Sequence, residues 1–271
     1  ALTRAFKPRA MRGILAAMKV RGMVLYGSGA CPHPMPTTRD DIGKRHQSGA
    51  SGNALRAAVF GVNDGLVSNA ALIYGVAGAA AEPSVIVLTG VAGLLAGAFS
   101  MAAGEYVSVR SQREMFEYQI GLERDELDQY PQEEAAELAL IYAAKGMPPD
   151  EARRVADILM QDPGRALDTL AREELGLNPD ELGSPWVAAL SSFVAFTVGA
   201  AVPLLPFLLA AGDNMLMFSI VVTGVGLFAV GATLSLFTGR RALASGLRML
   251  LIGGGAGLAT YFIGTRIGGV P

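Results

Sequence analysis

Long apolar runs separated by short polar breaks occupy most of the chain, and one polar block interrupts them. Five runs reach the length of about 20 residues that a helix needs to cross a bilayer. Lipid offers no hydrogen-bond partner to an open strand edge, so all five should be helices. The pattern predicts an all-α membrane protein with five transmembrane helices, roughly at residues 57–80, 85–109, 186–209, 215–237 and 247–265.

The polar block lies between the second and third apolar runs and is strongly acidic. Of the 24 Asp and Glu residues, 18 fall within residues 111–181, whereas residues 184–238 carry one charge, Asp213. Helix-forming residues continue from the second run to Asp128, and two shorter helical segments follow at 148–160 and 164–175. We therefore expect a compact helical module inserted between transmembrane helices 2 and 3.

Basic residues indicate the orientation of the chain in the membrane. Of the 22 Lys and Arg residues, 21 precede the first run or lie in the second-to-third and fourth-to-fifth connections, all on one side. Because Lys and Arg concentrate on the cytosolic side, the N-terminus and the module should be cytosolic and the C-terminus outside. The predicted domains are a basic irregular tail (1–52), helices 1–2 (53–110), the module (111–183) and helices 3–5 (184–271).

Glycine spacing and the N-terminal tail are less informative about structure and function. The Gly93–Gly97 pair and the glycines from Gly253 to Gly257 are typical of close helix contacts; packing within one subunit is the favoured interpretation, and a dimer contact is the alternative. In the tail, Cys31 and His33 are not followed by a second pair of metal ligands, so no metal site is predicted there.

Ionisable residues within the apolar runs are the first functional candidates, because burying a charge is costly unless it is paired or hydrated. Asp64 lies in the first run, with Asn63, Ser68 and Asn69 as polar neighbours. A structural carboxylate held by nearby hydroxyls is the alternative interpretation. In the second run Glu105 follows Met101 by four residues, which places a thioether and a carboxylate on one helical face. That combination suits a borderline transition metal.

Two pairs of glutamates in the module form the second candidate. Glu123 and Glu126 end the extended second helix, and Glu134 and Glu137 follow a turn at Tyr130. Carboxylates three residues apart project from one helical face, and a bound cation would relieve the repulsion among four of them. A solvated acidic face paired with arginines is the alternative interpretation.

The chain resembles the vacuolar iron transporter family, which exchanges ferrous iron for protons. The resemblance runs from about residue 53 to 268 and rests on four motifs: Gly-Val-Asn-Asp-Gly at 61–65, Ser-Met-Ala-Ala-Gly-Glu-Tyr at 100–106, the Glu-rich insert, and Ser-Gly-Leu-Arg-Met-Leu at 245–250. It implies a homodimer with five spans per subunit and a path lined by the first two helices. Some bacterial members carry a ferritin-like domain before the first span, and we expect none here.

The resemblance also implies roles for individual residues. The path residues would be Asp64 and Met101, joined in our prediction by Glu105 and Asn63. A path carboxylate of some members would fall at Gly93, where Glu105 is the candidate substitute, and a module methionine of some members would fall at Leu170. The metal ligands of the module would be Glu123, Glu126, Glu134, Glu137 and Glu174.

We therefore predict export of Fe²⁺ from the cytosol by proton antiport, with Mn²⁺, Co²⁺ and Zn²⁺ as further cations and a bacterial inner membrane as the location. The partners would be divalent metal ions, protons, lipid and a second copy, without nucleic acid. No nucleophile–base pair or phosphate loop indicates an enzyme, and no catalytic cofactor is expected. The alternative function is a membrane-anchored acidic scaffold that binds a basic partner.

Overall fold

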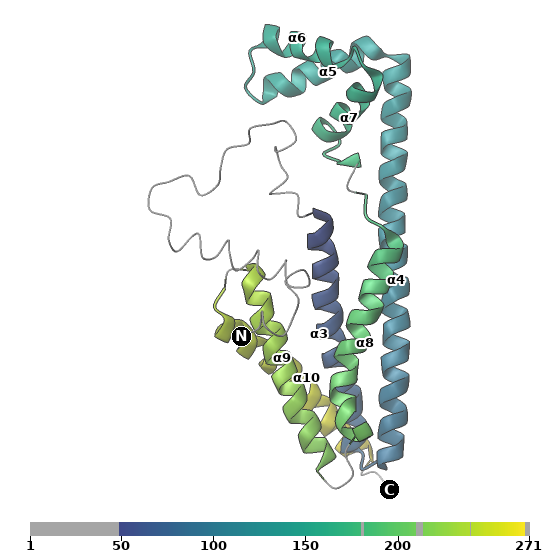
Figure 1. Cartoon of the computed structure of the whole chain (residues 1–271), viewed down its shortest axis with the longest axis vertical. Coiled ribbons are helices and arrows are strands. Elements are labelled where there is room, and N and C mark those ends of the chain that lie inside the picture. Colours follow the sequence, from purple (N-terminus) through teal and green to yellow (C-terminus); the bar gives the residue numbers. More distant parts are fainter. Residues whose placement is uncertain (1–48, 180–181, 210–213, 239, 269–271) are drawn as a thin grey trace, which may run out of the picture. The chain divides into compact units, whose positions relative to one another are not determined.

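The computed structural model describes residues 49–179, 182–209, 214–238 and 240–268, and its regular elements in these ranges are helices (Figure 1). They confirm the predicted all-α class. The predictions for Cys31, His33 and the rest of the tail lie outside the described residues. The helices are α3 (Gly49–Gly78), α4 (Pro83–Gln129), α5 (Pro131–Ala144), α6 (Pro149–Leu159), α7 (Pro163–Glu173), α8 (Pro185–Leu209), α9 (Met215–Thr238) and α10 (Ala242–Gly268).

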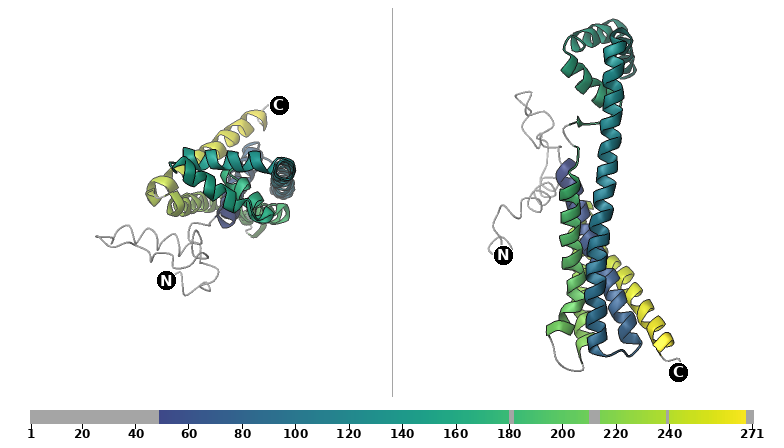
Figure 2. Two further views of the ribbon diagram at one scale, coloured as in Figure 1. Left: turned by 90° about the horizontal axis from the view of Figure 1, so that it is seen from above. Right: turned by 90° about the vertical axis from the view of Figure 1, so that its right-hand side faces the viewer.

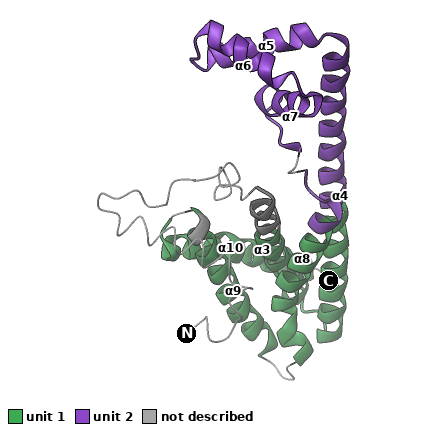
Figure 3. Ribbon diagram, turned by 45° about the horizontal axis from the view of Figure 1, so that its top comes forward, with its two compact units in different colours: residues 1–103, 189–271 green, residues 104–188 purple. Residues whose placement is uncertain are grey.

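The chain divides into two compact units (Figure 3). The first unit comprises Ala1–Ala103 and Ala189–Pro271, and the second comprises Gly104–Ala188. Helix α4 contributes to both units, because it continues for 47 residues without a break (Figure 2). Its N-terminal part is apolar and its C-terminal part carries the charged residues, as the sequence predicts.

Four helices among the described residues are long and apolar enough to cross a membrane: α4, α8, α9 and α10. Helix α3 has the predicted place and is 30 residues long. It is not one of the four, and its sequence includes the polar residues Asn63, Asp64 and Asn69. A fifth crossing by α3 remains a prediction.

Small residues allow close helix packing in the first unit. Helix α10 packs against α3 and α9. Where α3 meets α8, a Cβ atom on Gly65 would collide with the carbonyl oxygen of Phe196, so only glycine fits there. Two of the predicted contact glycines face side chains of their own chain: Gly97 faces Phe196 and Gly257 faces Tyr74. These two agree with packing inside one subunit, whereas a Cβ on Gly254 or Gly255 would meet no described atom within 4 Å.

Helix α8 receives hydrogen bonds from two neighbouring helices near its prolines. Pro203 and Pro206 lie inside the helix and supply no N–H donor. The Ser219 hydroxyl of α9 donates to the carbonyl oxygen of Pro203 at 2.6 Å. The Asn69 amide of α3 donates to the carbonyl oxygen of Ala200 at 2.7 Å. The two hydrogen bonds therefore tie α3 and α9 to α8 and give the polar side chains of both helices an acceptor within the apolar unit.

The second unit has its own apolar core. Helices α5 and α6 pack together, and α7 contacts both. The Asp162 side chain caps α7 by accepting hydrogen bonds from the backbone N–H groups of Gly164 and Arg165. The buried core residues are Leu127, Leu138, Ala139, Ala152, Ala156, Ala166 and Leu170. This core holds the end of α4 and the three short helices in one arrangement.

Candidate metal centre

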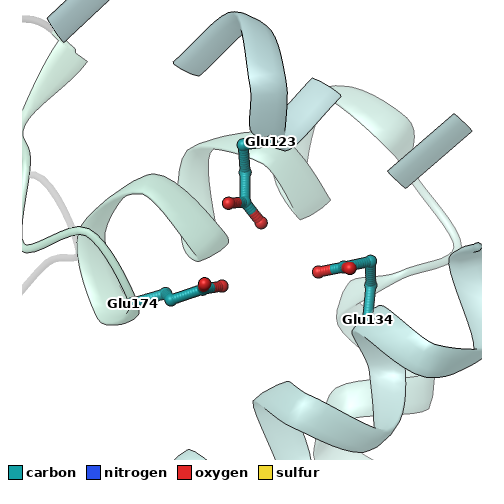
Figure 4. Close-up of side chains that lie close together, drawn as sticks. All are labelled: Glu123, Glu134 and Glu174. Atoms are coloured by element: carbon teal, nitrogen blue, oxygen red, sulfur yellow. The ribbon is translucent and has the colours of Figure 1, made fainter. Parts of the chain in front are cut away.

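Three glutamates from separate helical segments converge in the second unit (Figure 4). Glu123 lies in α4, Glu134 lies in α5, and Glu174 follows the last residue of α7. Each offers a carboxylate oxygen, and these oxygens all lie within 4.8 Å of one another. Glu123 and Glu134 are buried, with 3% and 7% of their surface exposed, and Glu174 is exposed.

Local structure explains why these carboxylates meet. Leu127, one turn after Glu123, anchors the end of α4 in the apolar core. The chain then breaks at Tyr130, and Pro131 begins α5, so Glu134 falls in the first turn of α5. Leu170 is fully buried one turn before Glu174 and fixes the end of α7. The apolar core thus positions all three acids.

The cluster is electrostatically costly without a cation. Burial and the neighbouring carboxylates of Glu174, Glu134 and Glu126 raise the pKa of Glu123 to about 8. Burial, followed by the charges of Glu174, Glu137 and Glu126, raises the pKa of Glu134. Burial and the charge of Glu137 likewise raise the pKa of Glu174. A proton on Glu123 therefore offsets part of the repulsion at neutral pH.

The two other predicted ligands lie close by without joining the group of three. Glu126 and Glu137 are exposed, and their charges act on the pKa values of the three convergent acids. Within the described part of the chain, the ion pairs of the second unit join other acids: Arg110–Glu114, Arg113–Glu117, Arg172–Asp168 and Lys145–Glu173. No arginine neutralises the cluster there, which argues against the solvated-face interpretation.

The cluster offers oxygen ligands of one chemical kind. Three carboxylates can hold a divalent cation at short range, and they suit hard and borderline ions such as Mg²⁺, Mn²⁺ and Fe²⁺. Leu170, where the family resemblance would place a module methionine of some members, packs in the apolar core. The three convergent ligands are all carboxylates, so they do not by themselves select softer metals.

A second candidate site is a pocket of about 320 Å³ in the first unit, between α3, α4 and α8. It brings together Asp64 and Met101, two of the predicted path residues. Asp64 is exposed rather than buried. The Ser68 hydroxyl donates to the main-chain carbonyl of Asp64 at 2.6 Å and not to its carboxylate. The carboxylate is therefore not held as the structural alternative requires.

The other predicted path residues do not line this pocket. Glu105 lies one turn beyond Met101 on α4, and Asn63 has a buried side-chain oxygen that finds no hydrogen-bond partner among the described residues. Two lining residues that the sequence did not single out as ligands are Asn69 of α3 and Phe196 of α8. Asn69 stood out only as a polar residue near Asp64, and Phe196 looks like any apolar residue of its helix.

Comparison with known proteins identifies the family. The model of the VIT family matches residues 55–265, which covers both candidate sites. The chain belongs to the VIT family. With its four apolar helices of spanning length, this VIT protein is a multi-pass membrane protein.

Plants and protists contain proteins similar to this VIT protein. It is 34% identical to vacuolar iron transporter 1 of Oryza sativa subsp. japonica over 78% of this chain and 84% of the relative. It is 33% identical to vacuolar iron transporter 1 of Arabidopsis thaliana over 78% of this chain and 85% of the relative. A vacuolar iron transporter of Acanthamoeba castellanii is 39% identical over 60% of this chain and 59% of the relative.

Proposed function

We propose that this VIT protein carries ferrous iron out of the cytosol in exchange for protons, with manganese as a second cargo. The observation that carries the proposal is the pocket that brings a carboxylate and a thioether together, Asp64 and Met101, in the apolar unit. Its relatives are named iron transporters. A carboxylate with a thioether suits a borderline cation better than Mg²⁺.

The two sites have different tasks in this proposal. The carboxylates of Glu123, Glu134 and Glu174 collect the cation from the cytosol through local negative potential and direct ligation. Glu126 and Glu137 strengthen that potential, since both are exposed beside the group. The pocket of α3 and α4 then passes the cation across the apolar unit. Metal therefore concentrates in the module before it reaches the pocket.

Asp64 links metal movement to proton movement. A divalent cation near a carboxylate favours its ionised form, so a cation and a proton compete for the same group. Binding of iron at Asp64 should therefore release a proton, and protonation from the outer side should release the iron. This alternation couples the two fluxes without a second ion site.

We also propose an orientation in the membrane and an oligomeric state. Five crossings, including α3, place the N-terminus and the second unit in the cytosol of a bacterium and the C-terminus outside its inner membrane. Two copies form a homodimer, as the family resemblance implies. The excess of Lys and Arg on one side of the apolar runs supports this orientation.

An acidic scaffold is not favoured. A scaffold needs no carboxylate beside a thioether in its apolar unit, yet Asp64 and Met101 line one pocket. The family match also covers both units of the chain and is not confined to the acidic one. The relatives carry names of transporters, which indicate neither a scaffold nor an enzyme.

Flux in proteoliposomes tests the proposal. Purified protein is reconstituted with Fe²⁺ outside and a chelating fluorophore inside, with and without a pH gradient, and empty liposomes serve as the control. We expect uptake that accelerates when the lumen is acidic and that alkalinises the lumen in proportion to the iron moved. Iron uptake equal to that of empty liposomes would exclude transport. Iron uptake at the same rate with and without the pH gradient would exclude proton antiport.

A further inference from the structure

A buried side-chain oxygen without a partner lies in the wall of the α3–α4 pocket. Asn69 is 2% exposed and lines the pocket together with Asp64 and Met101. Its amide nitrogen donates to the carbonyl oxygen of Ala200, which fixes the rotation of the side chain. Its Oδ1 atom is buried and accepts no hydrogen bond from the described residues. A buried acceptor left without a partner costs about 1–3 kcal/mol, so this oxygen calls for an explanation.

The free oxygen faces Gly93 of α4, a position without a side chain. A Cβ atom on Gly93 would lie 2.8 Å from Asn69 Oδ1 and 2.5 Å from a methyl group of Leu72. Gly93 and Leu72 line the same pocket. Gly93 therefore places no side chain against the Oδ1 atom, and the end of Leu72 fills that space.

We propose that Asn69 Oδ1 is a ligand of the transported cation, placed beside Asp64 and Met101 and reached through the gap at Gly93. The inference rests on the proposed function and adds a residue to its pocket. A side-chain amide oxygen is a hard, neutral donor. Together with one carboxylate and one thioether it makes a mixed set that suits a borderline divalent metal.

The neutral charge of this ligand has a consequence for release. A set with one carboxylate leaves a net positive charge on the bound divalent ion, so the complex is weaker than one with two carboxylates. Leu72, which is 40% exposed, has to turn its methyl group away when the cation reaches Oδ1. Binding at Asn69 is therefore readily reversible, as a translocation site requires.

Binding of Mn²⁺ to the full chain in detergent tests the assignment without transport. Glu123, Glu134 and Glu174 are first changed to Gln, so that the remaining bound Mn²⁺, measured by the electron paramagnetic resonance of the free ion, reports the pocket. We expect Asp64→Asn to abolish this binding. Asn69→Leu should weaken it at least about tenfold, as for other changes around metal sites.

Three further variants separate ligation from folding. Asn69→Asp keeps an oxygen at the site and should retain binding. Gly93→Ala leaves Asn69 in place but fills the gap over Oδ1, and should weaken binding like Asn69→Leu. Gly90→Ala, one turn earlier on α4, adds a Cβ against the apolar ends of Leu204 and Ile73 and should change nothing.

The outcomes are distinct. Unchanged Mn²⁺ affinity in Asn69→Leu and Gly93→Ala, or no pocket binding at all in the background variant, would overturn the inference. Equal losses in Asn69→Leu and Asn69→Asp, with a lowered melting temperature, would assign Asn69 to its hydrogen bond with Ala200 and also overturn it. The protein could also bind Mn²⁺ in a way that requires Asn69 and yet move no metal into liposomes. That result would support Asn69 as a ligand and refute the proposed transport.

Discussion

Glu123 and Glu134 belong to different helices, and their carboxylate oxygens lie within 4.8 Å of each other and of Glu174 (Figure 4). The helix break at Tyr130 brings them together by turning the chain back between α4 and α5. Because burial and the neighbouring acids raise the pKa of Glu123 to about 8, a cation must compete with a proton for this group. Three of our predictions follow from this cluster and two from the pocket.

Metal binding to the cluster should become tighter as pH rises. Below pH 8 Glu123 holds a proton that the incoming cation displaces, so affinity for Mn²⁺ should increase up to about tenfold per pH unit between pH 6 and 8. Calorimetry of the full chain in buffers of different ionisation enthalpy measures both the affinity and the released proton. Glu123→Gln should weaken the dependence, whereas Glu133→Gln, in the same turn as Glu134 but outside the cluster, should keep it. A flat profile in the wild type would contradict the prediction.

The stability of the second unit should have the opposite pH dependence when no metal is bound. Glu123 binds its proton more tightly in the folded state, because its folded pKa is raised. Stability is therefore full below the ordinary glutamate pKa of about 4.3 and falls between there and pH 8, by at most about 1.4 kcal/mol per pH unit for one proton. Thermal unfolding of the full chain at pH 5 and pH 8 in a chelator measures this. Glu123→Gln should flatten the fall, and added Mn²⁺ should reverse it.

Neutralising the module should affect capture more than translocation. Glu134→Gln combined with Glu137→Gln removes two charges outside the apolar unit, so the iron concentration for half-maximal flux should rise roughly tenfold. The maximal rate should stay at the wild-type value. Proteoliposome flux over a range of iron concentrations separates the two quantities, with Glu133→Gln as the matched control. A lost maximal rate would instead make the cluster part of the translocation step.

Removing the charge of Asp64 should stop coupled transport. Asp64→Asn keeps the shape of the side chain but has no proton to exchange and a weaker ligand, so flux should fall below about a tenth of wild type, a barrier increase of at least 1.4 kcal/mol. Glu82→Gln, an exposed acid between α3 and α4, is the control and should transport normally. Iron flux and lumenal pH are recorded together. Wild-type flux in Asp64→Asn would refute the proposed coupling.

Replacing the thioether should change metal preference. Met101→Leu keeps the volume of the side chain to a good approximation and removes the one soft ligand atom among the residues that line the pocket. Competition between Fe²⁺ and Mg²⁺ for flux should then shift several-fold toward Mg²⁺. Met115→Leu, exposed on the same helix, should leave the ratio as it is. An unchanged ratio in Met101→Leu would assign Met101 to packing alone.

The sequence predicted the helices better than the contacts between them. Hydropathy and proline positions located α4 to Asp128, one residue short of its end at Gln129, as well as the break at Tyr130 and the short helices α6 and α7. Spacing within a helix placed Glu123 near Glu126, but only the family resemblance brought in Glu174, since its approach depends on how α7 packs. Asn69 Oδ1 and Gly93 meet across two helices, and the periodicity of one helix contains no information about such a crossing.

Helix α8 also constrains how the protein is made. Its carbonyl groups at Ala200 and Pro203 receive donors from Asn69 and Ser219, and Pro203 and Pro206 bring none of their own. Newly inserted α9 on its own would expose the Ser219 hydroxyl to hydrocarbon, where a polar group without its partner is costly. Because that partner lies on the preceding helix of the chain, α8 and α9 gain stability by leaving the translocon together as a hairpin.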